Sequence, residues 1–141
     1  MRKLYIINSI LVILFVSSCK LSSLMGDKDL KNGYIFTADG NQACIIFSTS
    51  KPYRGTGLQV IPAKVVEVKY DKNYIIAKSI DKGKSEKKYW IIDKSISIDL
   101  NDCTDQASCD SLLRSNVEGP LDSILFNKKL KENSIPLNFD N

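Results

Sequence analysis

Cysteines and carboxylates are the side chains through which this sequence can do chemistry. The 141 residues include four cysteines and 16 acidic side chains but no histidine. Histidine is the commonest general base and the commonest metal ligand in proteins. Its absence excludes histidine-dependent catalytic triads and zinc sites built with histidine. Any catalytic chemistry would have to rest on carboxylates, lysine, tyrosine or cysteine.

Cys19 stands at the end of a stretch that is typical of exported proteins. A short basic start precedes an apolar run over residues 4–16, which is shorter than the roughly 20 residues of a membrane-spanning helix. The sequence Val16-Ser17-Ser18-Cys19 resembles the bacterial lipobox. In proteins with that motif, lipid is attached to the cysteine thiol and the leader is removed. We therefore predict a lipoprotein signal peptide over residues 1–18 and lipidation of Cys19. An ordinary secretory signal and an uncleaved anchor remain as alternatives.

A lipid on Cys19 would decide where the rest of the chain lies. Two or more acyl chains anchor a protein stably, so we expect the protein in the cell envelope, lipid-anchored to a bacterial membrane, with its domain on the non-cytoplasmic side. We predict a lipidated tether over residues 19–32 and a single domain over residues 33–141. Removal of the leader leaves 18 basic and 16 acidic side chains, a net charge of +2. This charge indicates no nucleic-acid partner.

The pattern of apolar residues predicts a β-rich domain. Residues 34–37 and 43–48 indicate strands, and residues 51–62 indicate a loop or an irregular edge. Three further strands are expected over residues 64–70, 74–80 and 88–93, and together they would form an antiparallel meander. A helix is expected from Asp122 or Ser123 to about Glu132, with lysines in its C-terminal half. We predict an α+β fold, an antiparallel sheet with the C-terminal helix packed on one face.

The cysteines beyond the anchor permit at most one intramolecular disulfide, because only Cys44, Cys103 and Cys109 remain. Six residues of continuous α-helix rise about 9 Å, whereas the Cα atoms of bridged cysteines lie about 4.4–6.8 Å apart. A helix through both Cys103 and Cys109 and a bond between them therefore exclude one another. We favour the bond, with a helix that starts near Ser108. A bond from Cys44 to either cysteine, or no bond, remains open.

Acidic residues cluster in the C-terminal half. Paired carboxylates for a hydrolase would have to come from Asp93, Asp99, Asp102, Asp105 and Glu118. A calcium loop that starts at Asp99 fails, because its fifth position is Cys103 and its sixth is Thr104, where glycine is needed. We predict no metal site, no cofactor and no catalytic residue.

Several apolar segments, in their order along the chain, resemble an uncharacterised family of small bacterial lipoproteins with a domain of unknown function. They are Ile61-Pro62-Ala63-Lys64-Val65-Val66-Glu67-Val68, Tyr74-Ile75-Ile76-Ala77-Lys78, Tyr89-Trp90-Ile91-Ile92-Asp93, Gly119-Pro120-Leu121 with Phe126, and Ile135-Pro136. The resemblance implies a lipoprotein and brings no activity. Residues 101–118 are longer than the resemblance implies and contain both Cys103 and Cys109, which supports their mutual pairing.

These observations favour a non-enzymatic, membrane-anchored domain that binds a protein partner or supports an assembly in the cell envelope. An edge strand or the insertion at residues 101–119 would provide the contact surface. The alternative is an immunity or inhibitor lipoprotein that neutralises an exported toxin or enzyme.

Overall fold

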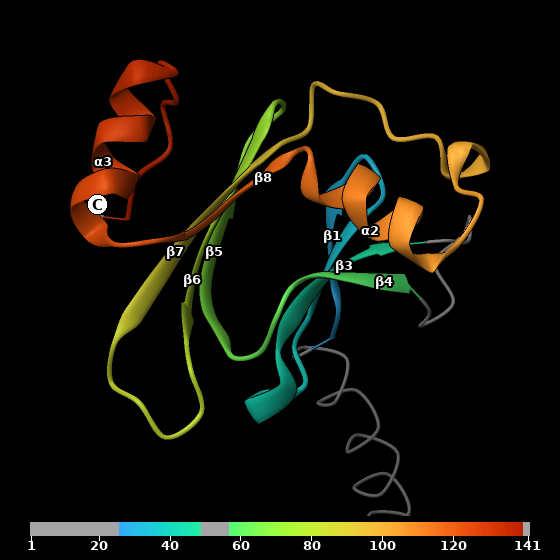
Figure 1. The fold of residues 1–141 in the computed structure, drawn as a ribbon. Helices are drawn as coiled ribbons and strands as arrows, with labels where there is room; N and C mark the ends of the chain where they lie inside the picture. The colour runs from blue at the N-terminus through green and yellow to red at the C-terminus, as the bar shows by residue number, and fades with distance from the viewer. Residues whose placement is uncertain (1–25, 49–56, 140–141) are drawn as a thin grey trace, which may run out of the picture.

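The computed structural model describes residues 26–48 and 57–139, which form two four-stranded antiparallel sheets and two α-helices (Figure 1). Sheet A has the order β1-β2-β3-β4, and sheet B has the order β5-β6-β7-β8. Strands that neighbour one another in each sheet are therefore consecutive in the chain. Antiparallel neighbours need only short connections, so each sheet is a meander.

The element bounds are as follows. Sheet A contains β1 (Lys28–Lys31), β2 (Tyr34–Thr37), β3 (Cys44–Ser48) and β4 (Gly57–Ile61). Sheet B contains β5 (Val65–Tyr70), β6 (Tyr74–Ile80), β7 (Lys87–Asp93) and β8 (Val117–Leu121). The α-helices are α2 (Gln106–Arg114) and α3 (Ser123–Glu132), and short 3-10 turns are η3 (Gly40–Gln42) and η4 (Leu100–Asp102).

The first hairpin depends on the dipeptide Asn32-Gly33. Both residues have positive φ, 55° and 89°, and Lys31 pairs with Tyr34 across the two-residue turn. Such backbone angles are those of the type I′ hairpin turn, for which Asn-Gly is a favoured sequence. The turn folds Lys28–Lys31 back onto β2 and buries Leu30 completely. The predicted tether over residues 19–32 is therefore wrong for its last residues, which belong to the sheet.

The two sheets pack face to face around the main core. Tyr34 and Phe47 meet edge to face at 5.2 Å in sheet A, and Leu113 of α2 packs in the same cluster. The buried members of the core are Leu30, Tyr34, Ile45, Phe47, Val60, Ile61, Val65, Ile75, Ala77, Trp90, Ile92 and Leu113. The prediction of one sheet was wrong, because the N-terminal strands form a second sheet instead of extending the meander. That second sheet covers the face of sheet B opposite α3.

Helix α3 covers the outer face of sheet B (Figure 1). Alternation along β6 sends Ile75 and Ala77 toward sheet A and Ile76 toward the helix, where it clusters with Phe126 and Leu130. The Asp122 carboxylate caps α3 by accepting from the Leu125 N–H at 2.8 Å. The predicted C-terminal helix is present as α3, and the predicted meander strands are present as β5, β6 and β7.

Besides β1, two strands were missed because glycine and proline mark their segments as loops or turns. β4 (Gly57–Ile61) lies in a segment expected to be a loop or irregular edge, and β8 contains Gly119-Pro120, a dipeptide typical of turns. Proline is tolerated on an edge strand, where its missing N–H leaves no ladder bond unmade. β8 is such an edge, since it pairs with β7 alone. Both segments are therefore strands because they pair with a neighbouring strand, β4 with β3 and β8 with β7.

The Asn32-Gly33 turn provides a test of this fold. We expect Gly33→Ala to lower the free energy of unfolding by about 2–4 kcal/mol, because it adds the cost of a positive φ to a collision of Cβ with the Phe47 ring at 2.8 Å. Gly40→Ala is the matched control, since Gly40 also has positive φ but open space around its Cβ position. It should cost about 1–2 kcal/mol. Urea unfolding of both variants measures the difference, and equal losses would contradict the packing described here.

Candidate functional site

A cavity of about 570 Å³ lies at the end of the sandwich where the β1–β2 turn meets the segment after β7. Its walls combine turn residues of sheet A with a polar stretch of chain that leads toward η4. The residues that line it are Asn32, Gly33, Tyr34, Phe47, Ser48, Lys94, Ser95, Ile96, Ser97, Ile98, Asp99 and Asn101. One of them, Lys94, is a buried cation.

Lys94 is only 3% exposed, and backbone carbonyls hold its ammonium group. Its Nζ donates to the Leu30 carbonyl at 2.8 Å and to the Asp71 carbonyl at 2.5 Å, so it joins β1 of sheet A to the β5–β6 turn of sheet B. Its backbone carbonyl accepts from the Asn32 side chain, and its N–H donates to the Asn73 carbonyl. A lysine occupied in this way acts as a structural clamp.

Burial lowers the pKa of Lys94 below its usual 10.5, while the negative charges of Asp71 and Asp29 oppose the decrease. The Tyr34 hydroxyl is also buried and makes no hydrogen bond within the described residues. Burial raises the pKa of this hydroxyl above 10.0; the Asn116 side-chain amide opposes the rise and the charge of Asp93 adds to it. The Lys94 ammonium and the Tyr34 hydroxyl are both buried at this end of the sandwich.

The candidate carboxylates fall in different places. Asp93 and Glu118 line a second cavity of about 230 Å³. Each already has partners: Asp93 Oδ1 accepts from the Ser95 N–H and hydroxyl, and Glu118 lies 3.0 Å from Lys129 Nζ. The ion pair with Glu118 raises the pKa of Lys129.

The other three carboxylates lie around η4 and the start of α2. Asp99 accepts from the Asn101 N–H within its own turn, Asp102 belongs to η4, and Asp105 caps α2. The structure brings together only Asp93 and Glu118 of the five. Nowhere in residues 26–48 or 57–139 do three His, Cys, Asp or Glu side chains group closely enough to hold a metal ion.

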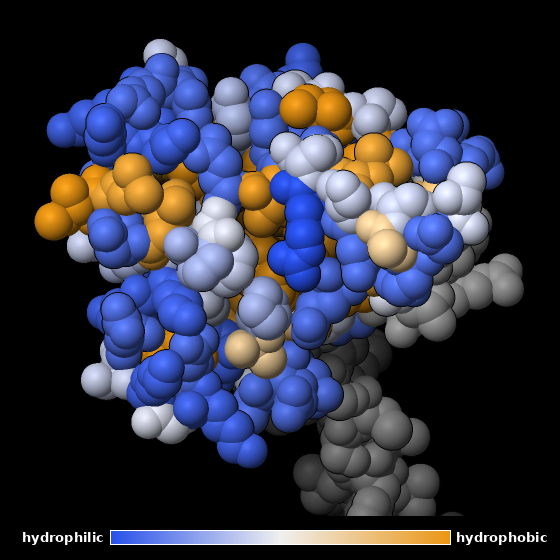
Figure 2. Space-filling view, in the orientation of Figure 1, coloured by the Kyte–Doolittle hydropathy of each residue, from blue (hydrophilic) through white to orange (hydrophobic). Residues whose placement is uncertain are grey.

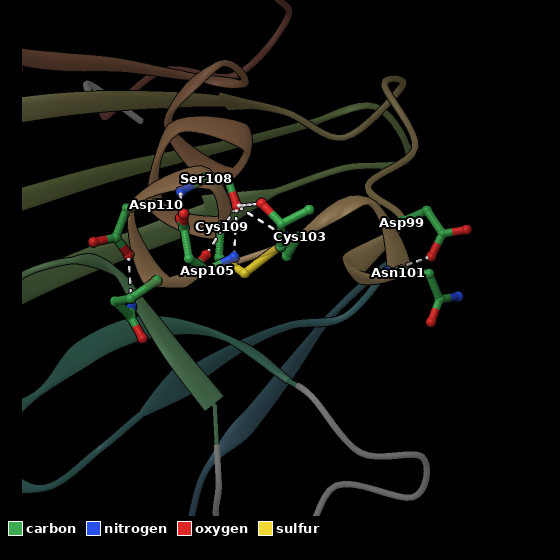
Figure 3. The surroundings of a disulfide bond; sticks show 9 residues. Asp99, Asn101, Cys103, Asp105, Ser108, Cys109 and Asp110 are labelled. Atoms are coloured by element: carbon green, nitrogen blue, oxygen red, sulfur yellow. Dashed lines mark hydrogen bonds between the residues drawn. A yellow bond between two sulfur atoms is a disulfide. The ribbon is translucent and has the colours of Figure 1, made fainter.

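A disulfide joins Cys103 to Cys109, with Cα atoms 4.9 Å apart (Figure 3). The bond coexists with a helix because α2 begins at Gln106, after Cys103, two residues earlier than expected. Asp105 and Ser108 form a reciprocal capping box, in which the Asp105 carboxylate accepts from the Ser108 N–H at 2.8 Å. That hydrogen bond lowers the pKa of Asp105. Cys44 is free and buried, so neither alternative bond to Cys44 is present.

Two adjacent apolar side chains are exposed at the start of α3. Ile124 is 82% exposed and Leu125 is 39% exposed, whereas Phe126 of the same turn is buried against sheet B. In Figure 2 a hydrophobic patch lies at the position of the first turns of α3. Successive residues of an α-helix point in different directions, so Phe126 packs against sheet B while Ile124 lies away from it.

The predicted signal peptide and Cys19 lie outside the described residues. No helix within the described part of the chain combines the length and hydropathy of a membrane span. A family model described as "Protein of unknown function (DUF3997)" matches residues 31–140. No curated protein and no solved structure matches the chain.

Replacement of Lys94 tests its role as a clamp. We expect Lys94→Met to lower the free energy of unfolding by about 2–3 kcal/mol, because it leaves the carbonyls of Leu30 and Asp71 without their charged donor. Lys72→Met removes an exposed lysine from the neighbouring turn and should change stability by less than about 0.5 kcal/mol. Urea unfolding at pH 7 compares the two variants. Similar effects would contradict the clamp.

The difference in stability between the wild type and Lys94→Met should also depend on pH. Since the pKa of Lys94 is lower in the folded than in the unfolded chain, the unfolded chain retains this proton to higher pH. The stability of the wild type relative to Lys94→Met should therefore rise with pH in the window that ends near 10.5. Tyr34 is present in both proteins, so its contribution to the pH dependence of stability cancels from the difference. A difference that falls with pH would be incompatible with a buried ammonium.

Proposed function

The chain belongs to the DUF3997 family of proteins of unknown function, and we propose from its own residues that it is a membrane-anchored bacterial lipoprotein whose domain binds a protein partner in the cell envelope without catalysing a reaction. The observation that carries the binding function is the exposed apolar pair on α3. The anchor rests on the sequence Val16-Ser17-Ser18-Cys19 after an apolar run.

Ile124 contributes little to the fold itself. Burial of an isoleucine or leucine side chain is worth about 1.5–3 kcal/mol, and Ile124 with 82% exposure gains almost none of it in the isolated chain. A partner that covers the first turn of α3 would recover this energy. Neighbouring exposed polar residues on α3, such as Asn127 and Lys128, would supply the polar rim that protein interfaces have.

The surface next to Ile124 suits a protein partner in shape as well. A cavity of about 280 Å³ lies between α3 and the segment that follows it, lined by Asn127, Leu130, Lys131, Ser134, Ile135, Leu137 and Asn138. One side chain of the partner can enter this groove while Ile124 contacts the neighbouring surface of the partner. We therefore propose α3 as the binding face, a different surface from the edge strand or the insertion at residues 101–119 that the sequence suggested.

The anchor is tested by lipid labelling in bacterial cells. We expect the wild-type chain to incorporate a fatty-acid probe and Cys19→Ala to remain unlabelled, because the thiol of Cys19 is the proposed attachment atom. Cys44→Ala is the matched control and should be labelled like the wild type, since Cys44 is buried in the domain. Labelled protein is measured by gel fluorescence. An unlabelled wild type would overturn the anchor.

The binding face is tested by site-specific photo-crosslinking in the same cells. A photoreactive amino acid at position 124 should form an adduct with one envelope protein, and the additional change Leu125→Ser should reduce its yield, because both side chains contribute to the patch. The same amino acid at position 72, an exposed site on the β5–β6 turn, is the control. Mass spectrometry identifies the partner and shows whether it is an exported toxin or enzyme. Equal adducts from both positions would remove the assignment to α3.

A further inference from the structure

The end of the domain at which the described chain begins carries a cavity lined by lysines. In Figure 1 the first described residues, η3, the β4–β5 connection and the β6–β7 turn all lie at the lower end of the view. The cavity there measures about 580 Å³ and is lined by Asn41, Gln42, Ala63, Lys64, Val66, Ile80, Asp81, Lys82, Gly83 and Lys84. The Asn32-Gly33 turn and Lys94 lie at the opposite end.

Positive charge predominates in this cavity, whose walls hold three lysines and one acid. The acid, Asp81, is already neutralised by Lys88 Nζ at 2.7 Å and lies 3.7 Å from Lys84 Nζ. The ion pair with Lys88 lowers the pKa of Asp81, so the carboxylate stays ionised and paired. Within the described residues, neither Lys64 nor Lys82 has an ion pair, and both are exposed.

Lys64 is held in place by a hydrogen bond from its Nζ to the Asn41 side-chain oxygen at 3.3 Å. This bond links the β4–β5 connection, which joins the two sheets, to η3 of sheet A, and Lys64 lines the cavity together with residues of the β6–β7 turn. Lys87, the first residue of β7, adds a further exposed cation beside that turn, and the exposed acids at this end are Asp27, Asp39 and Glu86. The lysines outnumber these acids at the cavity and around it.

The chain itself limits how far this end can lie from a membrane. Cys19 and Gly26 are seven residues apart, and a fully extended residue spans at most about 3.5 Å, so the domain starts within about 25 Å of the lipidated thiol. The tether is shorter than expected from the sequence because β1 begins at Lys28. The end of the domain at which the described chain begins is therefore kept near the bilayer to which the proposed anchor attaches.

We propose that this lysine-lined end, formed by η3, the β4–β5 connection and the β6–β7 turn, docks on the anionic phospholipid headgroups of the membrane that holds the anchor. The inference rests on the proposed lipidation of Cys19. Each lysine near an anionic membrane surface increases binding about fivefold. Docking fixes the orientation of the domain, with the lysine-lined end on the lipid and the Lys94 end away from it.

Amine labelling of the lipidated full-length chain tests the docking. The protein is purified from bacterial membranes and placed in vesicles of phosphatidylcholine, with or without phosphatidylglycerol. Mass spectrometry then measures acylation of individual lysines. We expect phosphatidylglycerol to reduce acylation of Lys64, Lys82 and Lys84 about fivefold. Lys72 at the opposite end and Lys131 on α3 should be unaffected, and salt near 1 M should abolish the protection because it screens charges beyond about 3 Å.

A charge-reversed variant separates electrostatic docking from simple crowding. Lys82→Glu with Lys84→Glu should remove the protection of Lys64 on phosphatidylglycerol vesicles. Lys72→Glu with Lys131→Glu makes the same change in net charge elsewhere and should leave that protection intact. Circular dichroism confirms that both variants are folded.

The outcomes distinguish this inference from the proposed function. A chain that does not float with vesicles of either composition refutes the lipid anchor and the docking with it. A chain that floats while Lys64, Lys82 and Lys84 label equally on both compositions refutes the docking alone. Protection by inorganic phosphate without vesicles would also overturn it, because the ligand would then be a free anion.

Discussion

The ammonium group of Lys94 joins the two sheets at one end of the sandwich. It donates to a carbonyl of β1 in one sheet and to a carbonyl of the β5–β6 turn in the other. A buried cation is stable only when its donors are satisfied, so these carbonyls must occupy their observed positions. The side chain of Asn32 and the carbonyl of Asn73 hold the Lys94 backbone in turn. The position of β1, and with it the second layer, depends on this set of hydrogen bonds.

Burial on both faces distinguishes sheet B from sheet A. Ile75 and Ile92 pack toward sheet A, and Ile76 and Ile91 pack under α3. Among the residues that the structure describes, the outer face of sheet A carries only the small cluster of Ile35, Cys44 and Ile46. The near-continuous apolar runs of β6 and β7 are thus explained by their place in the middle layer. Phe126 completes that layer from α3, stacking on Tyr89 at 4.9 Å.

The surfaces of the domain divide by physical character. The Lys94 end is closed by hydrogen bonds to backbone atoms, the opposite end exposes lysines, and α3 exposes Ile124. A lipid anchor at Cys19 would bring the lysine-lined end to the membrane. The proposed partner-binding face on α3 would then lie along the side of the domain, where an envelope protein could reach it. The two proposed contacts use different residues and do not compete.

The sequence by itself determined the local elements whose signals are strong. Alternation in residues 64–70 and the turns that follow predicted the meander of sheet B, and Asp122 with its apolar partners predicted α3. Asn32-Gly33 carried an equally strong hairpin signal, which the reading of residues 19–32 as a tether overlooked. The mutual pairing of Cys103 and Cys109 was favoured, and since a helix through both would hold them too far apart, the helix was expected to start near Ser108.

Only the tertiary structure decided how many sheets there are. β4 and β8 contain glycine or proline, which are typical of turns, and they become strands because a neighbouring edge offers unpaired N–H and carbonyl groups. The burial of Lys94, the shared cavity of Asp93 and Glu118 and the exposure of Ile124 are equally tertiary. Each depends on contacts between residues distant in sequence, as Lys94 and Leu30 are, and local propensity carries no information about such contacts.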